Sequence, residues 1–178
     1  MSISILVAAA SVLLANPAAS YVSAPSVVQK SDSWVEQARS ACRNGDFSTL
    51  FEAFVHSSQV RHLYSAPRIE QLTRGTPGVP LSSRPEGPDD FQIGAVDYTY
   101  GDAASIRRWE ADETQPFVRL NVEIHELSDG SVRVDFQPGE FIDDEEGDGA
   151  TFVRATGEPA AYVFAKVNQC WRLTQHLR

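Results

Sequence analysis

One stretch of the chain, residues 46–64, constrains the fold most because it concentrates apolar surface on one side of an expected helix. It reads DFSTLFEAFVHSSQVRHLY. The large apolar side chains recur at the spacing of a single helical face: Phe47, Leu50, Phe51, Phe54 and Val55. Short helices bury too little surface by themselves. We therefore expect this helix to pack against a sheet and to form the centre of the core.

Capping residues divide the N-terminal half into three expected helices. Ser33-Trp34-Val35-Glu36 fits the S-x-x-E capping box, which predicts a helix start at Ser33. Asn44-Gly45 predicts its end, and Asp46 can cap the second helix. Ser57-Ser58 can start a third helix that runs to about Tyr64. A short segment, Arg68–Leu72, is interpreted as an edge strand.

From residue 91 onward the apolar period changes to two, which is typical of strands. We expect a strand over Phe91–Tyr100 and a turn over 102–105, whereas Ser105–Ala111 fits either a strand or a helical turn. Phe117–Leu127 alternates clearly and begins a hairpin. A three-residue loop with Gly130 in the left-handed conformation would pair Ile124 with Val134. Further strands are expected at 132–137, 151–156, 160–167 and 170–177, the last two as a hairpin that places Phe164 opposite Leu173.

The first twenty residues resemble a signal peptide. Ile5–Ala15 is an apolar run too short to span a bilayer, and Ala18-Ala19-Ser20 supplies small residues for cleavage before Tyr21. We expect residues 1–20 to be removed, residues 21–178 to form a single domain, and the mature protein to be periplasmic or secreted, without attachment to a membrane. In an oxidising compartment, Cys42 and Cys170 are expected to form a disulfide.

Composition and missing motifs exclude several classes of function. The formal net charge is −9, which opposes binding to nucleic acid and to anionic membranes. The chain has no P-loop, no dinucleotide fingerprint and no H-E-x-x-H motif, so we expect neither a cofactor nor a metal. Two segments have no assigned role. They are the Pro/Gly-rich loop 74–90 and the acidic loop 143–149, whose composition suits Ca²⁺ but whose spacing does not match an EF-hand.

The expected fold class is α+β, with N-terminal helices packed on a curved antiparallel sheet of about five or six strands. This order of elements resembles the nuclear transport factor 2-like superfamily, on the aromatic helix DFSTLFEAFV and the final segment YVFAKVNQCWRLTQHL. The resemblance implies a sheet curled around a helix with a pocket at the wide end of a cone. Members of that superfamily include isomerases, dehydratases, transport factors and binding modules, so the resemblance leaves the function open among these classes.

Candidate site residues come mainly from the 117–137 hairpin. Glu123, His125, Arg133 and Asp135 share the face opposite the apolar one. If that face lines the cone, Glu123 and His125 could act as an acid–base pair with Asp97 and Tyr98 as further catalytic candidates, whereas Arg133 and Asp135 are candidates for ligand binding. Alternatively, all these charges simply form the solvated side of the sheet.

The favoured function is a non-catalytic module that binds a small ligand or another exported protein. One alternative is a small cofactor-free enzyme of isomerase or dehydratase type. Another is a secreted inhibitor or immunity-type protein that presents loop 74–90 or loop 143–149 to a partner.

Overall fold

The computed structural model describes residues 31–74, 86–143 and 149–178. The signal-peptide prediction for residues 1–20 and the cleavage site lie outside the described residues. So do most of the Pro/Gly-rich loop and most of the acidic loop.

Three helices follow one another at the start of the described chain: α1 (Ser31–Asn44), α2 (Phe47–His56) and α3 (Ser58–Tyr64). Gly45 separates α1 from α2 with a positive φ of 69°. The Asp46 carboxylate then accepts a hydrogen bond from the Thr49 backbone N–H at 3.0 Å, and Ser57 caps α3 in the same way through the Val60 N–H. These caps confirm the predicted joints. The predicted helix start at Ser33 is wrong, because α1 begins two residues earlier, at Ser31. Residues 31 and 32, a serine and an aspartate, are residue types that the first turn of a helix accepts.

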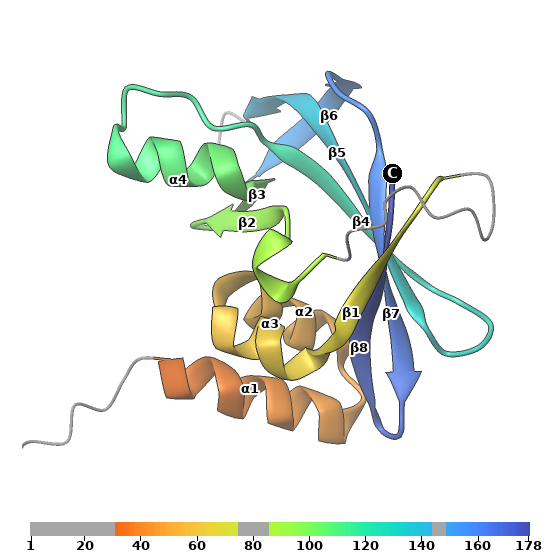
Figure 1. The fold of residues 1–178 in the computed structure, drawn as a ribbon. Coiled ribbons are helices and arrows are strands. Elements are labelled where there is room, and N and C mark those ends of the chain that lie inside the picture. Colours follow the sequence, from red (N-terminus) through yellow and green to blue (C-terminus); the bar gives the residue numbers. More distant parts are fainter. Residues whose placement is uncertain (1–30, 75–85, 144–148) are drawn as a thin grey trace, which may run out of the picture.

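The apolar face of α2 lies in the centre of the core, as predicted. Phe47, Leu50, Phe51, Phe54 and Val55 are all buried. The rings of the three phenylalanines surround that of Phe164 on the sheet, with centroid distances of 5.2, 6.2 and 5.2 Å. Figure 1 shows the three N-terminal helices gathered on one side of the sheet. Aromatic packing against the sheet, rather than helix propensity alone, therefore holds α2 in place.

The main sheet has six strands in the order β1-β8-β7-β5-β4, and β6 pairs with the far half of β5. Their bounds are β1 Ser65–Leu72, β4 Leu120–Glu126, β5 Val132–Asp143, β6 Ala150–Ala155, β7 Ala160–Val167 and β8 Cys170–Leu177. The fold class is α+β, as predicted, but the sheet is mixed, because β1 runs parallel to β8. Turn chemistry dictates antiparallel pairing only for strands that are neighbours in sequence, and β1 and β8 lie at opposite ends of the chain.

Both predicted hairpin registers are confirmed. Ile124 pairs with Val134 across a turn in which Gly130 has a φ of 79°. Phe164 pairs with Leu173 at the other hairpin. β5 pairs with β7 over its first half and with β6 over its second half. Gly139, at the start of the second half, allows close packing, since a Cβ there would lie 2.3 Å from the Phe152 ring.

The segment 91–111 differs from the prediction. The expected strand Phe91–Tyr100 is a small hairpin of β2 (Ile93–Val96) and β3 (Thr99–Asp102), which follows the 3-10 turn η1 (Pro88–Asp90). Asp97 makes the turn with a positive φ of 52°, a conformation that Asp tolerates better than most residues. The expected turn at 102–105 is the start of a helix, α4 (Ala103–Ala111), because the Asp102 carboxylate accepts from the Ser105 N–H at 2.7 Å.

Cys42 and Cys170 form the predicted disulfide, which joins α1 to β8. None of the helices in the described ranges is both long and apolar enough to cross a membrane.

Candidate functional site

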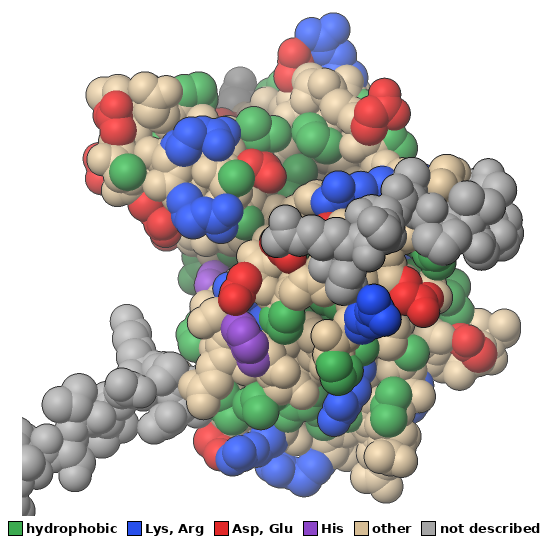
Figure 2. Space-filling model, in the orientation of Figure 1, with side chains coloured by type: hydrophobic (Ala, Val, Ile, Leu, Met, Phe, Trp, Pro, Cys, Tyr) green, Lys and Arg blue, Asp and Glu red, His purple; other side chains and the backbone are tan. Residues whose placement is uncertain are grey.

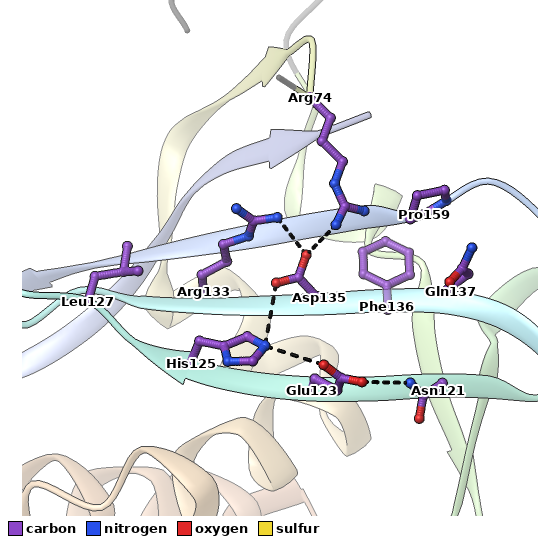
Figure 3. A pocket seen from close by; sticks show the side chains of 10 residues that line it. All are labelled: Arg74, Asn121, Glu123, His125, Leu127, Arg133, Asp135, Phe136, Gln137 and Pro159. Carbon is purple, nitrogen blue, oxygen red and sulfur yellow. Dashed lines mark hydrogen bonds and ion pairs between the residues drawn. The ribbon is translucent and has the colours of Figure 1, made fainter. Parts of the chain in front are cut away.

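A polar groove lies on the face of the sheet opposite α2 and is the best-developed candidate site (Figure 3). Its volume is about 430 Å³. The side chains that line it come from β4, β5 and three connections: Arg74, Asn121, Glu123, His125, Leu127, Arg133, Asp135, Phe136, Gln137 and Pro159. A volume of this size suits a small molecule.

Strand alternation places the polar side chains in this groove. Val132, Val134 and Phe136 of β5 are buried against the helices. Arg133 and Asp135 therefore point to the other face, where they lie opposite His125 and Glu123 of β4. The structure thus brings together four of the predicted site residues. The condition for an acid–base pair inside a cone is not met, because the opposite face of the same strands supplies the core and this face corresponds to the alternative, the outer side of the sheet.

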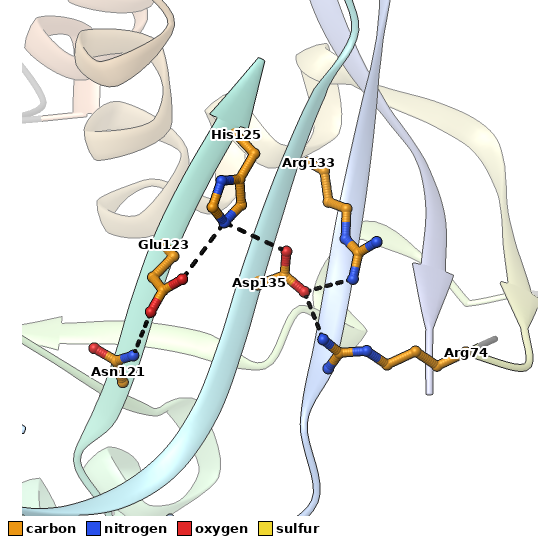
Figure 4. A network of polar contacts seen from close by, with 6 residues as sticks. All are labelled: Arg74, Asn121, Glu123, His125, Arg133 and Asp135. Carbon is orange, nitrogen blue, oxygen red and sulfur yellow. Dashed lines mark hydrogen bonds and ion pairs between the residues drawn. The ribbon is translucent and has the colours of Figure 1, made fainter. Parts of the chain in front are cut away.

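Asp135 is the centre of a network of charged side chains (Figure 4). Its Oδ1 accepts from Arg74 Nη2 at 3.0 Å and from Arg133 Nη2 at 2.6 Å. The Asp135 side chain is only 19% exposed, whereas those of the arginines are about one-third exposed. One carboxylate therefore holds two guanidinium groups side by side at the edge of the groove.

The other side of the network is looser and more exposed. His125 Nε2 lies 3.5 Å from Glu123 Oε2 and 3.8 Å from Asp135 Oδ2. Asn121 Nδ2 donates to Glu123 Oε1 at 3.0 Å. The two histidine–carboxylate separations are within ion-pair range but exceed the usual hydrogen-bond length. Glu123 and His125 are therefore available to a molecule in the groove.

Two members of the network, Asn121 and Arg74, were not among the predicted site residues, and Arg74 is the one that lies far from the hairpin in the sequence. It follows β1 and lies 61 positions before Asp135. Its place is secured by the backbone, since its N–H donates to the Arg178 carbonyl at the end of β8. No local pattern marks such a residue, because only the pairing of β1 with β8 brings it to the groove.

Asp97 and Tyr98 lie at a different place, on the turn between β2 and β3. They border a second cleft of about 690 Å³ whose walls include Tyr100, Arg119 and Phe141. Tyr98 is fully exposed. The structure therefore does not unite these two catalytic candidates with Glu123 and His125.

Tyr100, on the wall of the second cleft, is tied to helix α2. Its hydroxyl donates to Glu52 Oε2 at 3.1 Å. Burial, together with the negative charge and hydrogen bond of Glu52, raises the pKa of Tyr100 to about 12. The phenol therefore stays protonated and acts as a structural donor.

Two other histidines form close pairs with carboxylates. His56 Nε2 lies 2.8 Å from Glu52 Oε1, within the same helix, and its ring stacks on Trp34. His176 is fully buried, and its Nδ1 lies 2.7 Å from Glu86 Oε2. The ring of His176 also packs against Phe136 and Tyr162, so this histidine is part of the buried core.

Metal-binding geometry is absent from the part of the chain that the structure describes, where no three His, Cys, Asp or Glu side chains group around a common point. On the face shown in Figure 2, acidic and basic side chains are interspersed rather than gathered by sign.

The described chain is thus an α+β protein with a charged groove on the outer face of its sheet. No family model matches the chain, and no curated protein matches its sequence. Among solved structures, it is similar to a designed protein of the nuclear transport factor 2 type, at 10% sequence identity and a TM-score of 0.31. That match covers 82% of this chain and 93% of the designed one. At this TM-score the likeness supports no inference about function.

Proposed function

We propose that the protein is a non-catalytic binding module whose groove takes a small polar molecule with an anionic group, either a carboxylate or a phosphate. The observation that carries this proposal is the pair of guanidinium groups held by Asp135.

The arginine pair suits an anion because it is already in position. A guanidinium carries five N–H donors in a fixed plane, and Asp135 Oδ1 occupies only one donor nitrogen of each arginine. Within the described residues, Arg74 Nη1 and Arg133 Nε are buried and have no hydrogen-bond partner, so each arginine carries an unsatisfied donor that a small shift of its guanidinium would bring to an anion. Arginine recognises carboxylates and phosphates through paired hydrogen bonds, and side chains that are fixed beforehand lose less entropy on binding.

The opposite end of the groove favours donor groups on the same ligand. Glu123 and His125 are about half exposed and can accept hydrogen bonds from a hydroxyl or an ammonium group. The expected ligand therefore has an anionic group at one end and donors at the other.

The geometry gives less support to catalysis. For His125 to act as a base oriented by a carboxylate, its ring would have to lie within hydrogen-bond reach of that carboxylate. Here the separations are 3.5 and 3.8 Å, and Oδ1 of Asp135 is already occupied by two donors.

Calorimetric titration with glutamate and with inorganic phosphate, and with spermidine as a cationic counter-probe, tests the proposal. We expect at least one anionic probe to bind. The Arg133→Met variant should lose about 10- to 100-fold in affinity, the equivalent of a charged hydrogen bond of about 1.5–3 kcal/mol. Arg154→Met is the matched control, because Arg154 pairs with Glu140 away from the groove. If neither anion binds, or if Arg133→Met binds like the unaltered protein, the proposed function is wrong.

We also propose that the protein is exported to the periplasm or the extracellular medium as one domain after loss of residues 1–20, and that its fold belongs with the nuclear transport factor 2-like proteins. The disulfide supports export, since such bonds persist in oxidising compartments. Mass spectrometry of the exported protein should show Tyr21 as its first residue. A chain that retains Met1 would contradict export through this signal.

A further inference from the structure

Strand β4 ends the main sheet on one side. Arg119, the residue immediately before β4, forms an isolated bridge to Gly101 of β3. Beyond that point, in the described ranges, residues 121–126 of β4 pair with β5 alone. The other edge of β4 is therefore unpaired over residues 121–126, and at Asn121 and Val122 it borders the second cleft, beside the turn between β2 and β3.

The backbone groups on this outer edge follow from the pairing with β5. The Leu127 N–H donates to the Ser131 carbonyl, and the Gly139 N–H donates to the Arg119 carbonyl. In an antiparallel ladder these contacts alternate, so the odd-numbered residues of β4 bond to β5. The N–H and C=O groups of Val122, Ile124 and Glu126 consequently point away from the sheet.

This edge lacks several features that protect sheet edges from pairing. The strand reads LNVEIHE, with no proline and no lysine, and its register with β5 shows no bulge. Ile124 and Leu127 are 40% and 39% exposed. An extended segment can therefore reach the edge and continue the ladder.

We propose that β4 pairs antiparallel with β4 of a second copy of this chain, about a two-fold axis at Ile124. In this register Ile124 faces Ile124 of the second copy in a hydrogen-bonded pair, and Val122 faces Glu126. Glu123 and His125 then form the intervening close pair, once on each side of the axis.

Charge complementarity selects this occupant and this register. In this register the Glu123 carboxylate of each copy lies opposite the His125 imidazole of the other copy, and the two exposed Ile124 side chains cover one another. A register centred on Glu123 would instead place two carboxylates directly opposite, which is destabilising. Self-pairing also gives a closed two-fold interface, which stops after two copies. The two grooves would lie on the same side of the joined sheet, and Glu123 and His125, which the proposed ligand would contact, would also face each other across the axis.

Sedimentation velocity over a concentration series tests the proposal. The unaltered chain should reach twice its monomer mass. Ile124→Lys should remain at the monomer mass, because a charge at the axis faces its own copy. Val153→Lys is the matched control, since Val153 is an exposed strand residue on β6 and should leave the dimer intact.

Cross-linking provides a second measurement that does not depend on the lysine variant being folded. Ile124→Cys should form a disulfide between two copies under oxidising conditions, whereas Val153→Cys should not. The proposal is overturned if the unaltered chain stays monomeric throughout the series, or if a dimer forms that Ile124→Lys does not weaken and Ile124→Cys does not link. A monomer in which Ile124→Lys lowers stability would assign the edge to another segment of the same chain, which equally overturns self-pairing.

Discussion

Similar side chains in this protein make different contacts according to how deeply they are buried. Asp135 is mostly buried and organises two arginines, whereas Glu123, directly opposite on the neighbouring strand, stays exposed. Tyr100 is half-buried and bonded to Glu52, whereas Tyr98, two positions earlier, is fully exposed. Residues of the same type therefore cannot be ranked as site candidates without their surroundings.

The raised pKa of Tyr100 predicts a loss of stability at high pH. Below pH 10 the phenol is protonated in both the folded and the unfolded state, so its contribution is complete. Between pH 10 and 12 the unfolded chain releases the proton while the folded chain retains it, and the free energy of unfolding falls.

Urea unfolding across this range should show a shallower decline for Tyr100→Phe than for the unaltered protein. Tyr98→Phe, at an exposed position, is the control and should behave like the unaltered protein. An identical decline in the Tyr100 variant would contradict the raised pKa that burial and Glu52 give this phenol. Burial also raises the pKa of Tyr162, so some decline should persist in every variant.

At the scale of elements, short turns decide the strand registers and with them the composition of each face. The β4–β5 turn positions Glu123 and Asp135 on the groove side and leaves Val122 and Phe136 on the core side. Gly130, at this turn, also accepts a hydrogen bond through its carbonyl from Trp171 Nε1 at 3.0 Å. The turn therefore links the groove-bearing hairpin to β8.

We expect Gly130→Ala to lower the free energy of unfolding by about 1–2 kcal/mol, because a Cβ in the left-handed region meets the following carbonyl. The new Cβ would also lie 3.3 Å from Lys166 Cδ. Chemical unfolding measures the loss. Gly87→Ala is the control: that backbone has a negative φ, and among the described residues the atom nearest to its new Cβ would be Asp90 Oδ2, 3.8 Å away, so the change should be close to neutral. Equal effects at the two sites would contradict the conformational explanation.

At the scale of the molecule, contacts between distant parts of the chain hold the architecture together. The disulfide joins α1 to β8 across a sequence separation of 128. β1 lies against β8 in parallel, and Glu86 reaches back to His176 in the core and to Arg178. The C-terminal strand is thus the common partner of segments from the first half of the chain.

Loss of the disulfide should lower the free energy of unfolding by about 4–5 kcal/mol, because a long closed loop restricts the unfolded chain strongly. Unfolding with and without a reductant measures this difference. A Cys42→Ala/Cys170→Ala double variant should match the reduced protein and should not respond to the reductant. If reduction leaves the midpoint unchanged, the cross-link contributes nothing to stability.

Features that depend on neighbouring residues could be predicted from the sequence alone. They include the buried face of α2, the caps at Asp46 and Ser57, and the registers that pair Ile124 with Val134 and Phe164 with Leu173. Periodicity, capping and turn geometry act over a few positions, so a single chain displays them. The small hairpin at Asp97 was missed, and the choice between a strand and a helical turn over 105–111, where α4 lies, stayed open, because short apolar runs fit more than one element.

The contacts between groups that lie far apart in the chain could be seen only in the folded structure. It brought Arg74 to Asp135, buried His176 with Glu86, set β1 parallel to β8, and placed Glu123 and His125 outside the core rather than inside a cone. These contacts join residues far apart in the chain, and they form because the aromatic face of α2 occupies one side of the sheet and leaves the other to charged side chains.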